Sequence, residues 1–258
     1  MPLFSDQLGR IISLPQTPRR IISLVPSQTE LLYTLGLDDA VVGITKFCVH
    51  PGSWFRSKSR IGGTKAIDPA RVAALQPDLI IANKEENEKP QVDALAARYP
   101  VYVSDVRTLE DALVMIRDIG DITGKAPEAH ALAADIATRF HQLPLPAYPT
   151  PAAYLIWRNP WMAAGGDTFI HHMLHYCGYT NIFAGRDRYP TVDLSDLAGH
   201  NPPQILLSSE PYPFRQRHID EIKEILPQAS IRLVDGEFFS WYGSRLLEAP
   251  AYFRSFLQ

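Results

Sequence analysis

Cysteine, one-sided charge and long apolar runs are all scarce in this chain of 258 residues. Its two cysteines, Cys48 and Cys177, are too few for a disulfide framework, and free thiols are the simpler expectation. The formal net charge is −3 and no stretch is densely basic, which excludes a general nucleic-acid-binding protein. No apolar run reaches the ~18 residues of a membrane-spanning helix. Residues 1–10 also lack the apolar centre of a secretory signal peptide.

The composition and length are those of an ordinary globular protein. Hydrophobic residues make up 46% of the chain and charged residues 21%, which excludes a disordered chain or a coiled coil. A chain of this length buries enough surface to fold without a disulfide or a structural metal, as one large domain or two small ones. No cofactor is therefore required for folding.

The first part of the chain alternates short apolar strands with helical patterns. Ile21–Leu24 is a β-branched run, and Gln28–Leu37 follows it with leucines at helical spacing and a stop at Gly36. The alternation continues with strands over Val41–Ile44, Leu79–Ala82 and Val101–Val103, and with helices from Asp68 and over Val92–Ala97. This order predicts a mostly parallel sheet with helices on its faces.

The middle of the chain contains only helical patterns. Thr108 and Asp111 form a capping box before a predicted helix that runs to Ile122. Gly124 and Pro127 separate it from a second helix that runs to about Leu143. A proline-rich connector over residues 144–151 follows.

The alternation then resumes, with strands over Ala153–Trp157, Ile205–Ser208 and Ile231–Val234 and with helices over Thr168–Cys177, Leu194–Ala198, Ile219–Leu226, Ser244–Leu247 and Ala251–Leu257. We therefore predict an α/β protein with two Rossmann-like lobes, residues 1–107 and 148–258, joined by a helical segment over residues 108–147.

Ligands of open α/β sheets bind beyond the carboxyl ends of the strands, and the loops at these positions are rich in aromatic residues. Aromatic side chains offer large, rigid contact area to a flat apolar ligand, although about half of them are expected to be core residues. The candidate ligand-binding residues are Ser27, Gln28, Phe47, Cys48, His50, Trp157, Arg158, Tyr189, Tyr212, Phe238, Phe239, Trp241, Tyr242 and Arg245.

Two groups of residues could bind a metal ion. Cys48 and His50 lie two positions apart in a predicted strand-end loop, and a thiolate and an imidazole are metal ligands. A buried cysteine beside a hydrogen-bonded histidine is the alternative. His171, His172 and His175 share a predicted helix, where a surface cluster without a functional metal is the simpler interpretation.

Several segments together resemble the substrate-binding proteins of ABC importers that have a helical backbone (class III). They are Arg20–Leu31, Ile61–Thr64, Leu75–Ala82 and Gln91–Leu95, with looser matches near Asn181–Phe183 and Pro203–Leu206. Cobalamin-binding receptors are the most similar members. The resemblance implies two lobes joined by a single long helix, a ligand cleft between the lobes and no catalytic residues. It also implies cobalamin, haem or a ferric siderophore as the ligand.

The resemblance also suggests roles for single residues. Phe47, Tyr189, Phe238 and Phe239 fall at positions where a cobalamin receptor presents aromatic side chains. Thr64 and Asn83 stand where that receptor has tryptophan, so this side of the site is expected to be less aromatic.

Family members dock onto an ABC permease through one surface glutamate in each lobe. Glu86 or Glu88 would serve in the first lobe and Glu210 in the second. A monomer is expected. Its location would be periplasmic or membrane-anchored if a signal peptide has been removed, and cytoplasmic if Met1 is the native start.

An enzyme is the weaker interpretation, because the chain has no nucleophile elbow, phosphate loop or dinucleotide-binding motif. The alternative kept open is a cytoplasmic metal- or corrinoid-handling protein of the same fold. A chelatase of this kind would use His50 as ligand and Glu85 as base.

Overall fold

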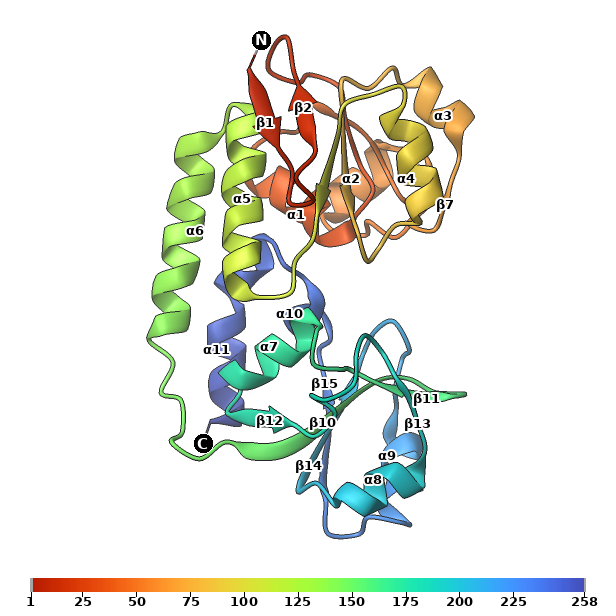
Figure 1. The fold of residues 1–258 in the computed structure, drawn as a ribbon, viewed down its shortest axis with the longest axis vertical. Helices are drawn as coiled ribbons and strands as arrows, with labels where there is room; N and C mark the ends of the chain where they lie inside the picture. The colour runs from red at the N-terminus through yellow and green to blue at the C-terminus, as the bar shows by residue number, and fades with distance from the viewer. Residues whose placement is uncertain (1, 258) are drawn as a thin grey trace. The chain divides into compact units, whose positions relative to one another are not determined.

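The protein is described here by a computed structural model, which covers residues 2–257 (Figure 1). The chain divides into two compact units. Unit 1 comprises the residues up to Val106, Glu110–Ala137 and Tyr242–Arg245, and unit 2 comprises Arg107–Leu109, Thr138–Trp241 and the residues from Leu246 onward. Each unit is built around its own sheet, as the sequence predicts.

The sheet of unit 1 is parallel throughout, in the order β5-β4-β3-β8-β9. Its strands are β3 (Ile21–Ser23), β4 (Val41–Ile44), β5 (Ser59–Arg60), β8 (Leu79–Asn83) and β9 (Val101–Ser104). Every residue of β3, β8 and β9 is buried. A parallel sheet covered on both faces selects such continuous apolar strands, which is why the sequence pattern identified them.

The helices of unit 1 connect these strands. They are α1 (Pro26–Thr34), α2 (Gly52–Ser57), α3 (Pro69–Ala74) and α4 (Lys89–Ala96). The predicted start of α3 is confirmed, because the Asp68 carboxylate accepts hydrogen bonds from the N–H groups of Ala70 and Arg71. Helix α2 was not predicted; only Trp54 of its six residues is buried, so it lacks an apolar stripe.

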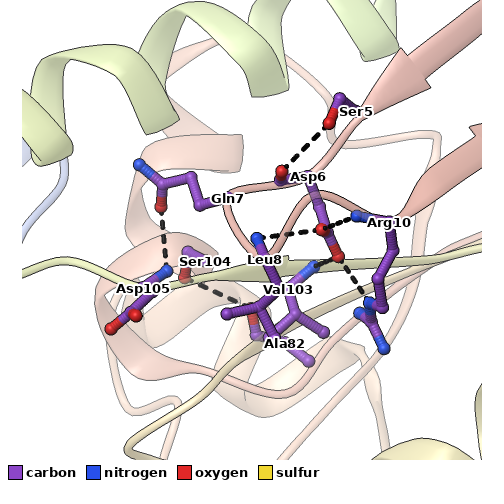
Figure 2. A network of polar contacts seen from close by, with 9 residues as sticks. All are labelled: Ser5, Asp6, Gln7, Leu8, Arg10, Ala82, Val103, Ser104 and Asp105. Atoms are coloured by element: carbon purple, nitrogen blue, oxygen red, sulfur yellow. Dashed lines mark hydrogen bonds and ion pairs between the residues drawn. The ribbon is translucent and has the colours of Figure 1, made fainter.

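A hairpin at the N-terminus also escaped prediction. Strands β1 (Leu3–Ser5) and β2 (Ile11–Ser13) pair with each other, and a second small hairpin joins β6 (Gly62–Gly63) to β7 (Ala66–Ile67). Figure 2 shows how the first hairpin is tied to β9. The buried Asp6 carboxylate accepts a hydrogen bond from the N–H of Val103, and Gln7 Oε1 accepts one from the N–H of Asp105.

Two helices follow, α5 (Leu109–Thr123) and α6 (Ala126–His141), and they separate at Gly124 as predicted. They pack closely at Gly120, where a Cβ atom would lie 2.2 Å from the Cβ of Ala129. The last turn of α6, from Thr138, belongs to unit 2, so α6 is a helix that runs from one unit into the other.

The sheet of unit 2 has the order β13-β11-β10-β14-β15, and β12 also pairs with β10. Its strands are β10 (Thr150–Trp157), β11 (Trp161–Ala163), β12 (Tyr179–Asn181), β13 (Thr191–Val192), β14 (Gln204–Ser208) and β15 (Ser230–Val234). Strands β10, β12, β14 and β15 are parallel, whereas β11 and β13 run antiparallel to their neighbours. A core that includes Leu155, Phe183 and Ile205 fills the unit.

The helices of unit 2 are α7 (Phe169–Tyr176), α8 (Leu194–His200), α9 (Gln216–Lys223), α10 (Glu237–Ser240) and α11 (Ala249–Phe253), with 3-10 turns over Ser244–Leu247 (in unit 1 for its first two residues) and Arg254–Phe256. The helix predicted over Ala251–Leu257 is confirmed in part, because α11 ends at Phe253 and the segment continues as a 3-10 helix to Phe256. No helix within residues 2–257 combines the length and the apolar character needed to cross a bilayer.

Candidate functional site

Two buried polar side chains follow strand β3 of unit 1. Ser27 and Gln28 lie in the first turn of α1, directly after β3, and are 4% and 0% exposed. Gln28 Nε2 donates to Ser104 Oγ at the end of β9 and contacts Met115 Sδ at 3.2 Å. These contacts give Gln28 a role inside unit 1 and argue against direct contact with a ligand.

The predicted ligand-binding residues Phe47 and Cys48, in the loop after β4, differ in exposure. The Phe47 ring is 51% exposed, and a Cβ atom on Gly63 would lie only 3.2 Å from it, so the ring rests on the glycine backbone of β6. Lys46 Nζ lies 5.1 Å from the ring centroid, at cation–π distance. Phe47 is thus a large apolar side chain held in solvent beside a positive charge.

Cys48 takes the opposite position and is fully buried. Its Sγ accepts a hydrogen bond from Thr29 Oγ1 at 3.1 Å and lies 3.2 Å from Thr45 Oγ1. Burial raises the pKa of this thiol, so the thiolate that a metal ion would require is disfavoured. The structure therefore argues against Cys48 as a metal or ligand contact and favours the alternative of a small buried cysteine.

Neither the pair Cys48 and His50 nor the histidine group His171, His172 and His175, for which a surface cluster without a functional metal was the simpler interpretation, belongs to a set of three or more metal-ligand side chains in the described part of the chain. Within residues 2–257, no group of three or more histidine, cysteine, aspartate or glutamate side chains is arranged to hold a metal ion. His50 is half-buried. His171 Nδ1 lies within hydrogen-bonding distance of Asn181 Nδ2, at 3.4 Å. The rings of His172 and His175 both pack edge-on against Tyr176.

The loop after β8 is fixed by two asparagines, Asn83 and Asn87, whose structural role the sequence did not reveal. Asn83 Oδ1 accepts hydrogen bonds from the N–H groups of Glu85 and Glu86, while Asn83 Nδ2 donates to Ser104. Asn87 Oδ1 accepts from the N–H of Asn83. Both asparagines are buried. The available signal in the sequence was their spacing, with Asn83 at the end of β8 and Asn87 four residues later.

This loop presents the predicted docking carboxylates of unit 1. Glu86 is half-buried, and Glu88 is exposed with its carboxylate 3.8 Å from Lys65 Nζ. Glu85, the base of the alternative enzyme interpretation, is half-buried as well.

In unit 2, a row of aromatic rings begins at the end of β10. Trp157 is 38% exposed and packs edge-on against Tyr212, with ring centroids 5.6 Å apart. Tyr212 contacts Phe214, and Phe214 stacks on Trp161 at 5.7 Å with an angle of 8° between the rings. The Arg158 guanidinium covers the Trp161 ring at 4.6 Å and pairs with Glu221. Trp157 is therefore the exposed end of a rigid row.

The residues after β15 are mostly core. Phe239 is fully buried against Tyr154 and Phe253, and Trp241 is 6% exposed. Phe238 is half-buried and stacks on Tyr252 at 4.5 Å. The structure thus argues against ligand contact by Phe239 and Trp241 and leaves Phe238 at the surface of this cluster.

Glu210 also has an internal role. Its carboxylate accepts hydrogen bonds from Ser240 Oγ at 2.7 Å and from Trp241 Nε1 at 3.0 Å. Burial raises the pKa of Glu210, and these two hydrogen bonds oppose that change. Glu210 is half-buried, and its hydrogen bonds to two donors of its own unit argue against the predicted role in docking to a permease.

The last candidates lie on separate segments. Tyr189 is half-buried in the loop before β13. Tyr242 and Arg245 belong to unit 1, where Tyr242 is buried and Arg245 forms a two-pronged ion pair with Glu30 at 2.6 and 3.1 Å. Arg245 is thus already paired with a carboxylate of its own chain.

Comparison with known proteins identifies the relatives of this chain. The family model described as periplasmic binding protein matches residues 21–226. A vitamin B12-binding protein of Yersinia pestis (strain Pestoides F) is 26% identical over 248 residues, which cover 93% of this chain and 86% of that protein.

Solved structures show the same fold. The periplasmic vitamin B12 binding protein of Vibrio cholerae superposes with a TM-score of 0.75 and 21% identity, covering 93% of this chain and 96% of the other. The periplasmic heme-binding protein of Roseiflexus sp. RS-1 gives 0.76 and 20%, covering 93% and 100%.

The match confirms the predicted resemblance and the predicted two-lobed α/β fold. It indicates a periplasmic protein with a small-molecule ligand, and it does not support the cytoplasmic or enzymatic alternatives. Since the family model covers most of the sequence, the chain belongs to the periplasmic binding protein family, whose members bind solutes and are not enzymes.

Proposed function

We propose that this protein is the substrate-binding protein of an ABC importer and that its ligand is a tetrapyrrole-type macrocycle, cobalamin or haem, with a ferric siderophore as the alternative. One observation carries the proposal. Each unit holds one large aromatic side chain in solvent at the carboxyl end of a central strand, Phe47 after β4 and Trp157 at the end of β10. Exposed aromatic rings at this end of a sheet are suited to a flat apolar ligand.

A charge beside one of these rings narrows the ligand class. Lys46 lies against Phe47, whereas Arg158 is already paired with Glu221. A cation next to an aromatic face favours a ligand that combines a flat ring system with acidic groups, such as carboxylates or a phosphate. The names of the similar proteins, which bind vitamin B12 or heme, agree with such a ligand.

The permease partner is proposed to contact the loop after β8. Glu86 is half-buried and Glu88 is exposed, and the asparagine pair Asn83 and Asn87 fixes the backbone that carries them. A fixed backbone lowers the entropic cost of docking through a charged side chain.

The test is a titration of the purified protein with aquocobalamin, haemin and a ferric hydroxamate in separate experiments, followed by ligand absorbance and by calorimetry. One of the three is expected to bind with a Kd below ~1 μM, equivalent to about −8 kcal/mol. Phe47→Ala and Trp157→Ala are each expected to weaken that ligand at least tenfold, because each removes a ring that the ligand would cover.

The matched control is Tyr148→Ala. Tyr148 is 92% exposed in the proline-rich connector that leads into the amino end of β10, whereas the proposed ligand contacts follow the carboxyl ends of strands, so its loss should leave affinity unchanged. Circular dichroism should show all three variants folded. Failure of all three ligands to bind, or equal affinity of the Trp157→Ala variant and the native protein, would refute the proposal.

A further inference from the structure

We infer that Tyr212 and Arg217 of unit 2, positioned by the buried His218, bind an acidic group of the ligand; this inference rests on the proposed function. These three residues, the His218 cluster, follow the carboxyl end of β14, in the loop after this strand and in the first turn of α9. The Tyr212 ring packs edge-on against Trp157, with ring centroids 5.6 Å apart. The cluster therefore lies beside the exposed ring that the proposed function assigns to the ligand.

Two side chains of the cluster meet at the same ring nitrogen. Tyr212 Oη and Arg217 Nε each lie 3.2 Å from His218 Nε2. The imidazole is only 4% exposed, and the backbone N–H of Arg215 donates to its Nδ1 at 2.9 Å. A buried ring that is held by the backbone thus keeps a hydroxyl and a guanidinium close to each other.

The His218 cluster has more hydrogen-bond donors than acceptors. A neutral imidazole accepts through one nitrogen and donates through the other. The N–H of Arg215 can only donate, so Nδ1 is the acceptor and Nε2 carries the proton, which it donates to Tyr212 Oη. Nε2 then cannot accept from Arg217, and the Tyr212 hydroxyl has its own proton to donate. Both protons call for an acceptor from outside the cluster.

The surroundings keep His218 neutral at neutral pH. Burial lowers the pKa of His218, and the nearby charges of Arg217 and Arg158 lower it further. Glu221 opposes this change in part and is itself paired with Arg158. The neutral ring keeps its bond with the N–H of Arg215, which a protonated ring would lose.

Arg217 supplies the positive charge of the cluster. It is exposed and forms no ion pair within residues 2–257, whereas the neighbouring Arg158 is paired with Glu221. A guanidinium N–H and a hydroxyl proton can be accepted by the oxygens of one carboxylate or phosphate, whose charge Arg217 would balance. A neutral amide would balance no charge. The group that fits the cluster is therefore an acidic one.

The experiment compares ligands with and without an acidic group by calorimetry. The pairs are haemin with its dimethyl ester, and aquocobalamin with cobinamide, which lacks the phosphate. Arg217→Ala should weaken the acidic member of the pair about tenfold, and Tyr212→Phe about fivefold, because hydrogen bonds to a charged group are lost. Neither variant should change the affinity for the member without the acidic group.

His218→Asn tests the positioning role. The asparagine oxygen can replace Nδ1 as the acceptor for the N–H of Arg215, but the shorter side chain has no atom in the place of Nε2. This variant should weaken the acidic ligand and leave its neutral partner unchanged, whereas a merely structural role would weaken both alike. Because His218 acts through Tyr212, the losses from His218→Asn and Tyr212→Phe should not add in the combined variant.

Lys223→Ala is the matched control for charge. It removes one positive charge from the last turn of the same helix, where Lys223 Nζ donates to Pro227 O at 3.0 Å. The affinity for both members of each pair should remain unchanged. Circular dichroism should show all variants folded.

Three outcomes would overturn the inference. They are undiminished binding of the acidic ligand by the Arg217→Ala variant, an equal loss for both members of a pair in that variant, and binding of the ferric hydroxamate alone, which has no acidic group outside the atoms that hold the iron. In all three, the native protein still binds a ligand, so the proposed function stands while the inference fails. Absence of binding by every ligand would refute the proposed function and the inference with it.

Discussion

The two units stabilise their strand-end loops by different means. In unit 1, the loops are held by buried polar side chains, with Asn83 and Gln28 both hydrogen-bonded to Ser104. In unit 2, the corresponding region is held by packed rings, with Phe214 stacked on Trp161 and Phe239 enclosed by Tyr154 and Phe253. Sheets of similar plan thus acquire rigid loops through separate kinds of interaction.

This difference has consequences for substitutions. A hydrogen-bonded network fails when one member is removed, because its buried partners are left without bonds. An aromatic cluster loses stability in proportion to the volume that a truncation leaves empty. The stability of unit 1 should therefore respond most to substitutions that change the polarity of a side chain at constant size. The stability of unit 2 should respond most to substitutions that change the size of a side chain at constant polarity.

The largest effect is expected at the centre of the aromatic cluster in unit 2. Phe239→Ala should lower the free energy of unfolding by about 3–5 kcal/mol, because a fully buried ring is replaced by a cavity. Urea unfolding, monitored by circular dichroism, measures the change.

The adjacent residue on α10 is the matched comparison. Phe238→Ala removes a ring that is only half-buried and stacked on one partner, Tyr252, and should lower the same free energy by about 1 kcal/mol. Equal losses for the two variants would show that burial does not set the stability of this unit.

A smaller effect is expected in the polar network of unit 1. Asn83→Ala should lower the free energy of unfolding by about 2 kcal/mol, because Ser104 and the N–H groups of Glu85 and Glu86 lose a buried partner. The same urea experiment measures it. Lys84→Ala, which removes only an exposed ion pair with Asp105, should change stability by less than about 1 kcal/mol. A neutral Asn83→Ala variant would contradict the contrast between the units.

Most of the fold could be predicted from the sequence, because buried parallel strands have a simple signal. Val41–Ile44 is matched residue for residue, and the two helices of the middle segment separate at Gly124 as expected. The strands that escaped prediction, such as β11 and β13, have two or three residues each. Strand β11 pairs with β10, and β13 pairs with β11. These pairings depend on tertiary contacts and not on a local apolar pattern, so sequence periodicity could not reveal the two strands.

The candidate site was less predictable than the fold. The position of a loop at a strand end follows from topology, but the exposure of each side chain in it does not. Phe47 and Cys48 are neighbours in sequence, yet one ring is half in solvent and one thiol is fully buried. Glu210 and Trp241 were assigned separate surface roles, although they bond to each other. Tertiary packing decides these cases.

The smallest expected effect is on the pH dependence of stability. It tests whether the few polar groups in the aromatic region of unit 2 contribute to the stability of the folded protein. Burial raises the pKa of Glu210 above its ordinary value of 4.5, whereas hydrogen bonds from Ser240 and Trp241 lower it in part. The folded protein therefore keeps this proton to higher pH than the unfolded chain does. Stability should fall as pH rises from about 4.5 through the raised pKa, since the folded state binds more protons in this range.

Glu210→Gln removes the titration and keeps an oxygen that can accept from Ser240 Oγ and Trp241 Nε1. Urea unfolding between pH 4 and pH 8 should show the variant gaining stability relative to the native protein as pH rises. Ser240→Ala, which removes one hydrogen bond that lowers the pKa, should make the pH dependence of the native carboxylate steeper. If the stabilities of the Glu210→Gln variant and the native protein change in parallel with pH, the pKa of Glu210 is the same in the folded and unfolded states, and the aromatic surroundings of this carboxylate in unit 2 do not disfavour its charge.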